Sequence, residues 1–430
     1  MVDHNPEEGV AAEAANRRSL TSIAAAFGMF FMVLSAYYII RPVREEFGSS
    51  LGPAGLQTAF LLVFAVMLAA VPIFGLIVKR APRRFVLPAI YAFFALNLVA
   101  FYLAFEAREP NGLAASLFFV WASVFNLFVV SLFWSLMSEL WSNAEASRNY
   151  GVIAAGGSAG AVAGPLMTQA LLNYLKPTDL LLVSAALLTG ALFASLLFRR
   201  ARAGATSDQK QEMGGGVFDG AIKLLQSPYL AHIALFVLLA NVVGTFFYLE
   251  QSRLVAATIP ESADRVRFFA GRDLIVSVAT IAIQLFGTAA VLQRFGATAA
   301  LLALPAMAAI GVAALAADPT LTVVAAVMVG ERVAAFALSN PAIKVMYTLT
   351  TTDEKYKTQN FIDTVVYRGG DATSGWLFQS VGKGAGFATL TTPLIAIPLI
   401  AIWMWNAREL GRKHAQRAVL EQERAEAVAA

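Results

Sequence analysis

The stretch from Leu20 to Ile40 reads LTSIAAAFGMFFMVLSAYYII and contains no charged side chain. A helix needs about twenty consecutive apolar residues to cross the hydrocarbon core of a membrane, so this stretch predicts a membrane-spanning helix. It follows a polar N-terminal segment and ends at Arg41-Pro42. Because the run is longer than the apolar region of a secretory signal, we interpret it as a first helix that the protein retains.

The composition of the 430 residues agrees with a membrane protein. Hydrophobic residues make up 58% and charged residues 14%, whereas a soluble globular protein carries about 25% charged residues. The net charge of +4 does not indicate a nucleic-acid partner, because the basic residues lie in short blocks between apolar runs, as topology signals do. The chain has no cysteine and its three histidines are far apart, so we expect no disulfide, no metal site and no cofactor.

The hydropathy pattern predicts about twelve spans in two halves, with a polar stretch between them. The first half has spans at Leu20–Ile40, Leu56–Val78, Phe85–Phe105, Leu113–Leu140, Tyr150–Leu172 and Leu180–Phe198. The second half has spans at Tyr229–Leu249, Leu274–Leu292, Ala297–Ala316, Leu321–Tyr347, Phe361–Val381 and Phe387–Trp405. The expected fold class is therefore an all-α membrane protein with two six-helix bundles, like the major facilitators.

The same pattern divides the chain into five parts. These are a cytoplasmic N-terminal tail (1–19), an N-terminal bundle (20–198), a cytoplasmic linker (199–227), a C-terminal bundle (228–405) and a cytoplasmic C-terminal tail (406–430). The basic blocks fall on one side of these spans, so the positive-inside rule places both termini in the cytoplasm, with the spans in a bacterial inner membrane. One predicted external loop, from Arg253 to Arg272, conflicts with this rule because it contains Arg265 and Arg267.

Three glycines of the fifth predicted helix, Gly156, Gly160 and Gly164, lie four residues apart on one face. Small residues at this spacing let two helices approach backbone to backbone in lipid. The simpler interpretation is tight packing. The functional alternative is that such smooth contacts allow one helix to rock on another.

The first helix ends in a polar cluster that begins at Tyr37. Proline ends helices, so Pro42 predicts the end of this one, and Arg41 and Glu45 are spaced to pair across one turn. A cluster at a membrane edge commonly anchors a helix at the interface. The alternative is that Tyr37, Arg41 and Arg44 face a central cavity, where guanidinium groups bind an anion bidentately.

Two charged groups lie inside later apolar runs: Glu331-Arg332 in the tenth, and Asp363, Arg368 and Asp371 in the eleventh. Charges at such depth are costly, and they normally face a bundle interior or a wet pathway and pair with one another. Arg368 and Asp371 are three residues apart and are expected to pair better than Asp363 and Arg368. The structural alternative is an ion pair that only locks two helices together.

Two amides within the apolar runs, Asn126 and Gln284, are weaker candidates. A lone amide in a membrane more often joins two helices by a hydrogen bond than binds a ligand. We include Asn126 among the candidate substrate-binding residues because it lies in the fourth span.

Three stretches resemble a known family of membrane proteins. They are Tyr37 to Glu46, Ser131 to Trp134 with Glu145 to Arg148, and Asp353-Glu354 through Asp363 and Arg368 to Gly375. In these stretches the chain is similar to the ATP/ADP translocase (nucleotide transporter) family of plastids and intracellular bacteria, and more closely to its relatives in free-living bacteria. The resemblance implies a major-facilitator-like transporter that exchanges anionic metabolites.

The chain departs from that family at its charged positions. Arg44 stands where the family has a lysine in the first helix, which preserves the charge. The acidic positions of the fourth and seventh helices fall near Ser123 and Gly244, and the lysine of the eleventh falls near Asp371. Nucleotides carry several negative charges that need cations or helix N-termini, so this reversal of sign puts nucleotide binding in doubt.

Three functions remain open at this point, and none of them is enzymatic. The first is an alternating-access transporter of a small anion, with Arg41, Arg44, Arg332 and Arg368 as its cations. In this hypothesis a coupling proton is carried by Asp371 or Glu331, because apolar surroundings favour the neutral form of a carboxyl group. The second is a proton-coupled exporter of cationic or amphipathic compounds lined by Glu331, Asp363 and Asp371. The third is a membrane scaffold or sensor, and in each case we expect a monomer.

Overall fold

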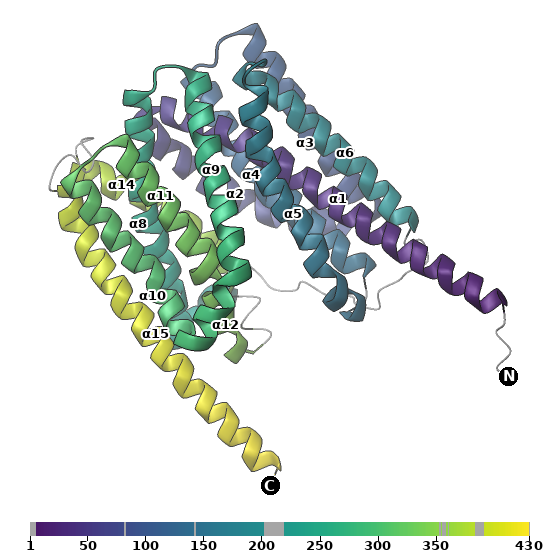
Figure 1. Ribbon diagram of the computed structural model, residues 1–430. Helices are drawn as coiled ribbons and strands as arrows, with labels where there is room; N and C mark the ends of the chain where they lie inside the picture. The colour runs from purple at the N-terminus through teal and green to yellow at the C-terminus, as the bar shows by residue number, and fades with distance from the viewer. Residues whose placement is uncertain are drawn as a thin grey trace.

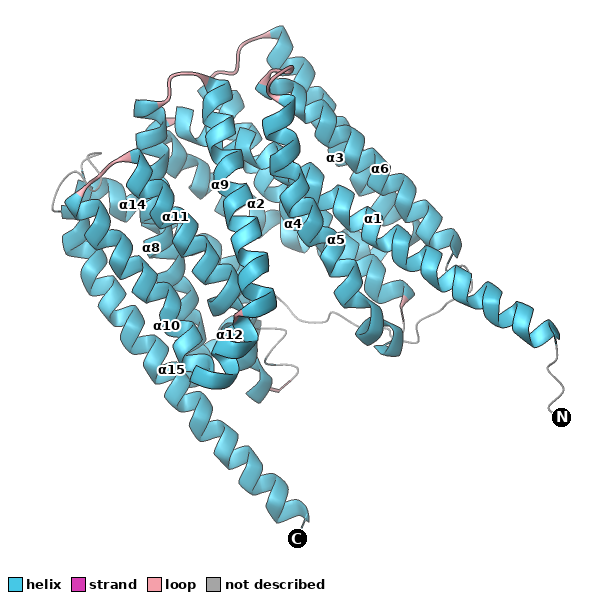
Figure 2. Ribbon diagram, in the orientation of Figure 1, coloured by secondary structure: helices cyan, strands magenta, loops and turns pink. Residues whose placement is uncertain are grey.

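The computed structural model describes residues 6–80, 83–141, 143–201, 219–351, 354, 358–359, 361–382 and 391–429. The described chain consists of helices joined by short turns (Figure 2). Helices suit lipid because they satisfy every backbone hydrogen bond within one segment.

The N-terminal half forms one bundle, which we call the N-bundle. It consists of α1 (Pro6–Ser50), α2 (Gly52–Arg80), α3 (Arg83–Ala107), α4 (Gly112–Leu140), α5 (Asn143–Leu171), the 3₁₀ turn η1 (Pro177–Asp179) and α6 (Leu180–Ala201). A short helix, α7 (Asp219–Gln226), lies within the predicted linker and precedes the second half.

The C-terminal half forms the C-bundle. It begins with α8 (Pro228–Thr258), α9 (Ser262–Phe286), α10 (Thr288–Ala317) and α11 (Leu321–Ala334). It continues with the π-helical segment η2 (Ala335–Ser339), α12 (Asn340–Met346), η3 (Tyr347–Leu349), the π-helical segment η4 (Ile362–Val366), α14 (Tyr367–Gly382) and α15 (Thr391–Ala429).

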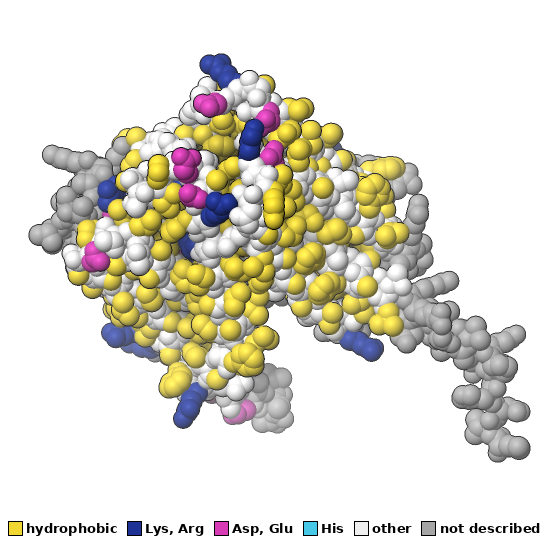
Figure 3. Space-filling model, turned by 45° about the horizontal axis from the view of Figure 1, so that its top comes forward, with side chains coloured by type: hydrophobic (Ala, Val, Ile, Leu, Met, Phe, Trp, Pro, Cys, Tyr) yellow, Lys and Arg dark blue, Asp and Glu magenta, His cyan; other side chains and the backbone are white. Residues whose placement is uncertain are grey.

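Within the described residues, ten helices are long and apolar enough to cross a membrane. Helix α14, with 16 residues, and helix α15, which begins after the undescribed residues 383–390, correspond to the last two predicted spans. Hydrophobic side chains cover most of the visible surface, and charged side chains gather towards its two ends (Figure 3). The molecule is a multi-pass membrane protein, as the sequence predicts.

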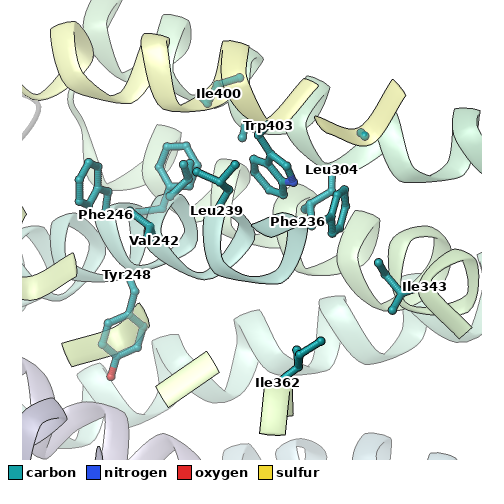
Figure 4. Packing of buried hydrophobic residues seen from close by; sticks show 14 of the residues in the cluster. Phe236, Leu239, Val242, Phe246, Tyr248, Leu304, Ile343, Ile362, Ile400 and Trp403 are labelled. Atoms are coloured by element: carbon teal, nitrogen blue, oxygen red, sulfur yellow. The ribbon is translucent and has the colours of Figure 1, made fainter. Parts of the chain in front are cut away.

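Two apolar cores correspond largely to the two halves, but α2 residues such as Leu56, Phe60 and Met67 belong to the second core with the C-terminal helices. The N-bundle core includes Phe118, Phe125 and Phe133 of α4, all fully buried. In the C-bundle core, Trp403 of α15 packs with Phe236 of α8 (Figure 4). A buried aromatic side chain contributes about 1.5–3 kcal/mol in water. In lipid, close packing between helices contributes the larger share of the stability.

The two bundles lie against each other at one end and diverge towards the other (Figure 1). Both termini lie at the diverging end, which we call the open end; the turns that follow α1, α5 and α8 lie at the closed end. Helix α5 contacts α9 and helix α2 contacts α14 across the interface between the bundles. The outline in Figure 3 is notched between the two lobes.

The glycine face of α5 lies on α1. A Cβ atom at Gly156 would meet the carbonyl oxygen of Phe27 at 2.5 Å, and one at Gly160 would meet that of Phe31 at 2.5 Å. One at Gly164 would meet the Cβ of Tyr38 at 2.6 Å. Real Cβ atoms do not fit at such distances, so any side chain here would separate the two helices.

The prediction that the first helix ends at Pro42 is wrong, because α1 continues to Ser50. Pro42 lacks the N–H that would bond to the carbonyl of Tyr38. Beyond it, Val43 and Phe47 are buried in the N-bundle core. Their packing outweighs the loss of one backbone hydrogen bond, which contributes about 0.5–1.5 kcal/mol.

The predicted eighth span, Leu274–Leu292, is also wrong, since the helix is α9, Ser262–Phe286. The predicted external loop from Arg253 to Arg272 is helical except at 259–261. A search for apolar runs excludes charged residues, and here Arg272 and Asp273 lie inside the helix because they are buried and paired. The loop is only a short turn, but Arg265 and Arg267 lie within the first two turns of α9, so the conflict with the positive-inside rule remains.

Candidate functional site

Ionisable and polar side chains from both bundles gather in the interface between them. We call this set the central polar cluster. Its members are Tyr37, Arg41, Arg44 and Glu45 of α1, Tyr248 and Gln251 of α8, Arg272 and Asp273 of α9, Glu331 of α11, and Arg368 and Asp371 of α14.

An ion pair joins the two bundles within this cluster. Nε of Arg41 lies 3.4 Å from Oδ2 of Asp273, and the two side chains are 10% and 1% exposed. Arg272 donates to Oδ1 of the same carboxylate at 2.8 Å and also donates to the amide oxygen of Gln251. One buried carboxylate thus faces two guanidinium groups, one from each bundle. The predicted pairing of Arg41 with Glu45 is wrong, because Asp273 reaches Arg41 from the other bundle.

Arg44 is held more loosely than Arg41. Its Nη2 lies 3.7 Å from Oε1 of Glu45, and its guanidinium lies 4.5 Å from the ring centre of Phe119. Its Nε is buried and has no hydrogen-bond partner within the described chain, and Oε2 of Glu45 is likewise buried. The hydroxyl of Tyr248 lies within reach of the Glu45 carboxylate. An unpaired buried donor costs about 1–3 kcal/mol, so these groups can bind a polar ligand.

Tyr248 lies on the side of α8 that faces the N-bundle. In Figure 4 its ring points away from the packing around Trp403 and Phe236. The ring contacts Phe60 of α2, with 5.5 Å between ring centres, and Phe60 contacts Phe119 at 5.7 Å. An aromatic wall therefore adjoins Arg44.

The predicted pair of Arg368 and Asp371 is present on α14. Nη1 of Arg368 lies 3.4 Å from Oδ2 of Asp371, and the hydroxyl of Thr245 donates to Oδ1 at 3.3 Å. The Arg368 side chain is 25% exposed. Asp371 also lies within electrostatic range of Arg44, so cations from both bundles act on this one carboxylate.

Glu331 contacts the seventh predicted span at Gly244. A Cβ atom on Gly244 would lie 3.1 Å from Oε1 of Glu331. Glu331 and Tyr37 both lie within electrostatic range of Tyr367 on α14. Within the described residues, Glu331 forms no ion pair or hydrogen bond, in contrast to the other three carboxylates of the cluster.

Two π-helical segments flank these residues. Segment η2 begins four residues after Glu331, and η4 ends two residues before Arg368. A π-helical turn widens the helix, leaves backbone groups unevenly bonded and occurs frequently at functional sites. Both segments belong to the C-bundle.

Not every predicted residue joins the cluster. Asp363 is exposed at the start of η4 and accepts a hydrogen bond from Gln359 at 3.5 Å. Asn126 is half-buried in α4, and Arg332 is half-buried beside Glu331. Gln284 donates to the carbonyl of Phe336 in η2 at 3.1 Å, which joins two helices as expected of a lone amide.

Four members of the cluster were not among the residues predicted from the sequence: Tyr248, Gln251, Arg272 and Asp273. Tyr248 lies inside the predicted seventh span, next to its end at Leu249, and Gln251 lies two positions beyond that end. Arg272 and Asp273 lie directly before the predicted eighth span, which begins at Leu274. The adjacent pair Arg272-Asp273 at the edge of an apolar run was the available signal, because opposite charges that neutralise each other can lie within a span.

Further contacts join the bundles at the closed end. Nη2 of Arg265 lies 2.8 Å from Oε1 of Glu46 on α1, and that carboxylate is 4% exposed. Arg267 donates to the carbonyl of Leu172 at 2.7 Å. These contacts hold the turn between α8 and α9 against the ends of α1 and α5.

The fold is similar to that of several solved transporter structures. A bacterial homologue of the human lysosomal transporter Spinster, in an inward-facing and unoccupied conformation, matches with a TM-score of 0.52 and 15% identity over 95% of each chain. The nucleoside transporter NupG matches with a TM-score of 0.54 and 13% identity, over 94% of this chain and 99% of the other. A POT family transporter in complex with a thioalcohol-conjugated peptide matches with a TM-score of 0.62 and 11% identity, over 90% and 96%.

No family model matches the sequence, and no curated protein matches it. The structural similarities extend over nearly the whole of each chain, so the protein has a major-facilitator-like fold. These three structures are not ATP/ADP translocases, so the similarities do not support membership of that family in particular.

Proposed function

We propose that the protein is a secondary transporter that moves a small anion across the membrane by alternating access. The observation that carries this proposal is the loosely paired Arg44, which lies in the interface between two bundles that diverge at one end. A guanidinium with an unpartnered buried donor is suited to a carboxylate or phosphate group. Arg368 faces the same region from the other bundle and is partly exposed.

In this proposal the N-bundle (20–198) and the C-bundle (228–405) rock about the central polar cluster. The diverging end is the one that admits substrate in the described state. Both termini lie at that end, and its similarity to an inward-facing structure supports a cytoplasmic position. We therefore propose a bacterial inner-membrane protein with cytoplasmic termini that works as a monomer.

A nucleotide is one candidate anion, because three stretches resemble the ATP/ADP translocase family. The central polar cluster offers less positive charge than a polyphosphate requires, because Arg41, Arg272 and Arg368 already face carboxylates. Asp371 stands near the position of that family's lysine and reduces the positive charge further.

The test is counterflow in proteoliposomes that contain the full chain, beside empty vesicles. Labelled ATP outside and unlabelled ADP inside test the nucleotide, and labelled phosphate and lactate with matching internal anions test smaller substrates. Uptake above that of empty vesicles supports the proposal. Arg44→Gln should abolish that uptake, whereas the exposed-site variant Glu421→Gln should not change it.

The alternatives give different results in the same vesicles. An exporter of cationic compounds would transport a lipophilic cation such as tetraphenylphosphonium and would lose activity in Asp371→Asn rather than in Arg44→Gln. A scaffold or sensor would give no flux of any probe by a monodisperse preparation, and Asp371→Asn would change no signal.

A further inference from the structure

The charges of the central polar cluster balance. It contains four guanidinium groups and four carboxyl groups: Arg41, Arg44, Arg272 and Arg368, and Glu45, Asp273, Glu331 and Asp371. With every group ionised, the net charge is zero. Within the described residues, no ion pair or hydrogen bond joins Arg332 to this set.

Glu331 differs from the other three carboxyl groups. Asp273, Glu45 and Asp371 each have a guanidinium nitrogen within 3.7 Å. Among the described residues, Glu331 has no such partner, and it lies instead against the backbone of α8 at Gly244. A carboxyl group without a cation at membrane depth changes its protonation state more readily than a paired one.

The ionisable groups around Glu331 come from few elements. Helix α14 contributes Tyr367, Arg368 and Asp371, and α8 meets it at a glycine. On α9, Asp273 forms ion pairs with its neighbour Arg272 and with Arg41 of α1. Helix α10 carries no ionisable side chain between Gly296 and Ala317.

We propose that Glu331 is the proton-binding group of the transporter and that the protein carries a singly charged anion together with one proton. This inference rests on the proposed function. The empty cluster, with Glu331 ionised, carries no net charge. The loaded cluster, with one proton on Glu331 and one negative charge at Arg44, again carries none. A state loaded with only one of the two carries a net charge in the low-dielectric interior, which is costly.

The surroundings of Arg44 indicate the rest of the substrate. Phe60, Phe119 and Tyr248 form an aromatic wall beside its guanidinium. Such a wall favours a planar or apolar body attached to the anionic group, because aromatic rings pack well in offset and edge-to-face arrangements. The inferred class is thus a monoanion with a flat apolar part, in contrast to a nucleoside triphosphate.

Cyclic AMP and ATP form a matched pair of probes for this inference. They share the base and the sugar, but cyclic AMP has a single negative charge that does not titrate near neutral pH, and it does not cross lipid unaided. Labelled cyclic AMP and labelled ATP are offered to proteoliposomes of the full chain, with and without an inward proton gradient. The membrane voltage is varied independently with potassium and valinomycin.

We expect uptake of cyclic AMP to exceed that of ATP, to rise several-fold with the proton gradient and not to respond to voltage. Glu331→Gln should lose the gradient-dependent part, and Glu421→Gln should retain it. ATP uptake equal to that of cyclic AMP, a voltage-dependent flux, or an undiminished gradient effect in Glu331→Gln would each overturn the inference.

A measurement without substrate separates this inference from the proposed function. Infrared difference spectra of the reconstituted protein between neutral and acid pH report a buried carboxyl group that takes up a proton. We expect a carboxylic acid band in the wild type and in Asp371→Asn, and its loss in Glu331→Gln. A band that persists in Glu331→Gln contradicts the assignment, even if counterflow succeeds. Absence of counterflow with the band present contradicts only the proposed function.

Discussion

Helix α1 in the N-bundle and helices α11 and α14 in the C-bundle present charges to the same interface in different ways. Helix α1 is continuous through Pro42, lies against the glycine face of α5 and has its charge Arg41 paired with Asp273 of α9. Helices α11 and α14 are each flanked by a π-helical segment, and no cation of the described residues forms an ion pair with Glu331.

The difference separates two tasks. A tightly packed helix with neutralised charges keeps its geometry while the bundles move. A widened helix with an unpaired carboxyl group can change both its hydrogen bonds and its protonation. We therefore assign the fixed anion-binding surface to α1 and the proton-linked change to α11 and α14.

The largest expected effect is the removal of Asp273. Asp273→Ala leaves the buried guanidinium groups of Arg41 and Arg272 without their carboxylate. Breaking a buried ion pair by removing one partner costs about 3–5 kcal/mol. The check is thermal unfolding of the purified protein in detergent.

A matched control lies on the same helix. Asp264 pairs with Arg267 at 2.9 Å, and both side chains are exposed, at 55% and 39%. An exposed pair contributes about 0–1 kcal/mol, so Asp264→Ala should change the unfolding temperature little. Equal effects of the two variants would show that the pair between the bundles is not important for stability.

The next effect concerns the contact between α1 and α5. Gly160→Ala places a Cβ atom 2.5 Å from the carbonyl oxygen of Phe31, so the helices must separate. We expect a cost of about 1–3 kcal/mol, as for other overpacked sites. Gly151→Ala on the same helix is the control, since a Cβ atom there meets nothing within 4 Å. If both variants unfold at the same temperature, the glycine face of α5 does not hold α1 in place.

A smaller effect on anion uptake is expected when the positive charge at position 44 is kept but the shape of the side chain is changed. Arg44→Lys retains the cation and loses the planar group that lies over Phe119. Lysine binds anions as a point charge rather than bidentately. We expect about a tenfold loss of anion uptake, equal to about 1.4 kcal/mol, with an unchanged unfolding temperature. Uptake at the wild-type rate would remove Arg44 from the binding site.

The smallest effect lies outside the membrane, where α15 meets the beginning of α8. His414 shares a hydrogen bond of 2.9 Å with the hydroxyl of Tyr229, and burial lowers the pKa of His414 below its ordinary value. The folded state therefore binds a proton less readily than the unfolded state. The contribution of the neutral His414 to the free energy of unfolding is therefore present above the ordinary pKa of about 6.5 and is lost as the pH falls below it.

The check is the unfolding temperature measured from pH 7.5 to pH 5.5, values chosen to lie about one unit either side of that pKa. We expect a small decline on acidification that is weaker in His414→Gln. An equal decline in the wild type and in His414→Gln would mean that other titratable groups cause it.

The sequence predicted the class of fold well because lipid imposes a simple rule: long apolar runs become helices that span the bilayer. It failed where tertiary contacts override that rule. Pro42 did not end α1, because the residues beyond it are buried. Asp273 was left outside the predicted eighth span, although it lies inside α9, where Arg41 and Arg272 neutralise it.

The candidate site was predictable only in part. Arg368 and Asp371 pair as their spacing suggested, because both lie on one helix. Partners from different helices, such as Arg41 and Asp273, are more than two hundred positions apart, and no local pattern relates them. Part of one stretch of the family resemblance, including Asp353 and residues 355–357, lies outside the described residues.

The central claim is that the two bundles rock, with the closed end opening as the open end closes. The chain has no native cysteine, so spin labels can be attached at chosen pairs. The exposed pair Tyr174→Cys and Glu261→Cys reports the closed end, and Arg148→Cys with Thr348→Cys reports the open end. Glu46→Gln weakens the ion pair with Arg265, which still donates to the carbonyls of Ile259 and Pro260.

We would measure both label distances by pulsed electron resonance in lipid nanodiscs, with and without Glu46→Gln. The account predicts that the variant gains a population with a longer distance at the closed end and a shorter distance at the open end. Unchanged distances at both ends, or lengthening at both, would contradict it.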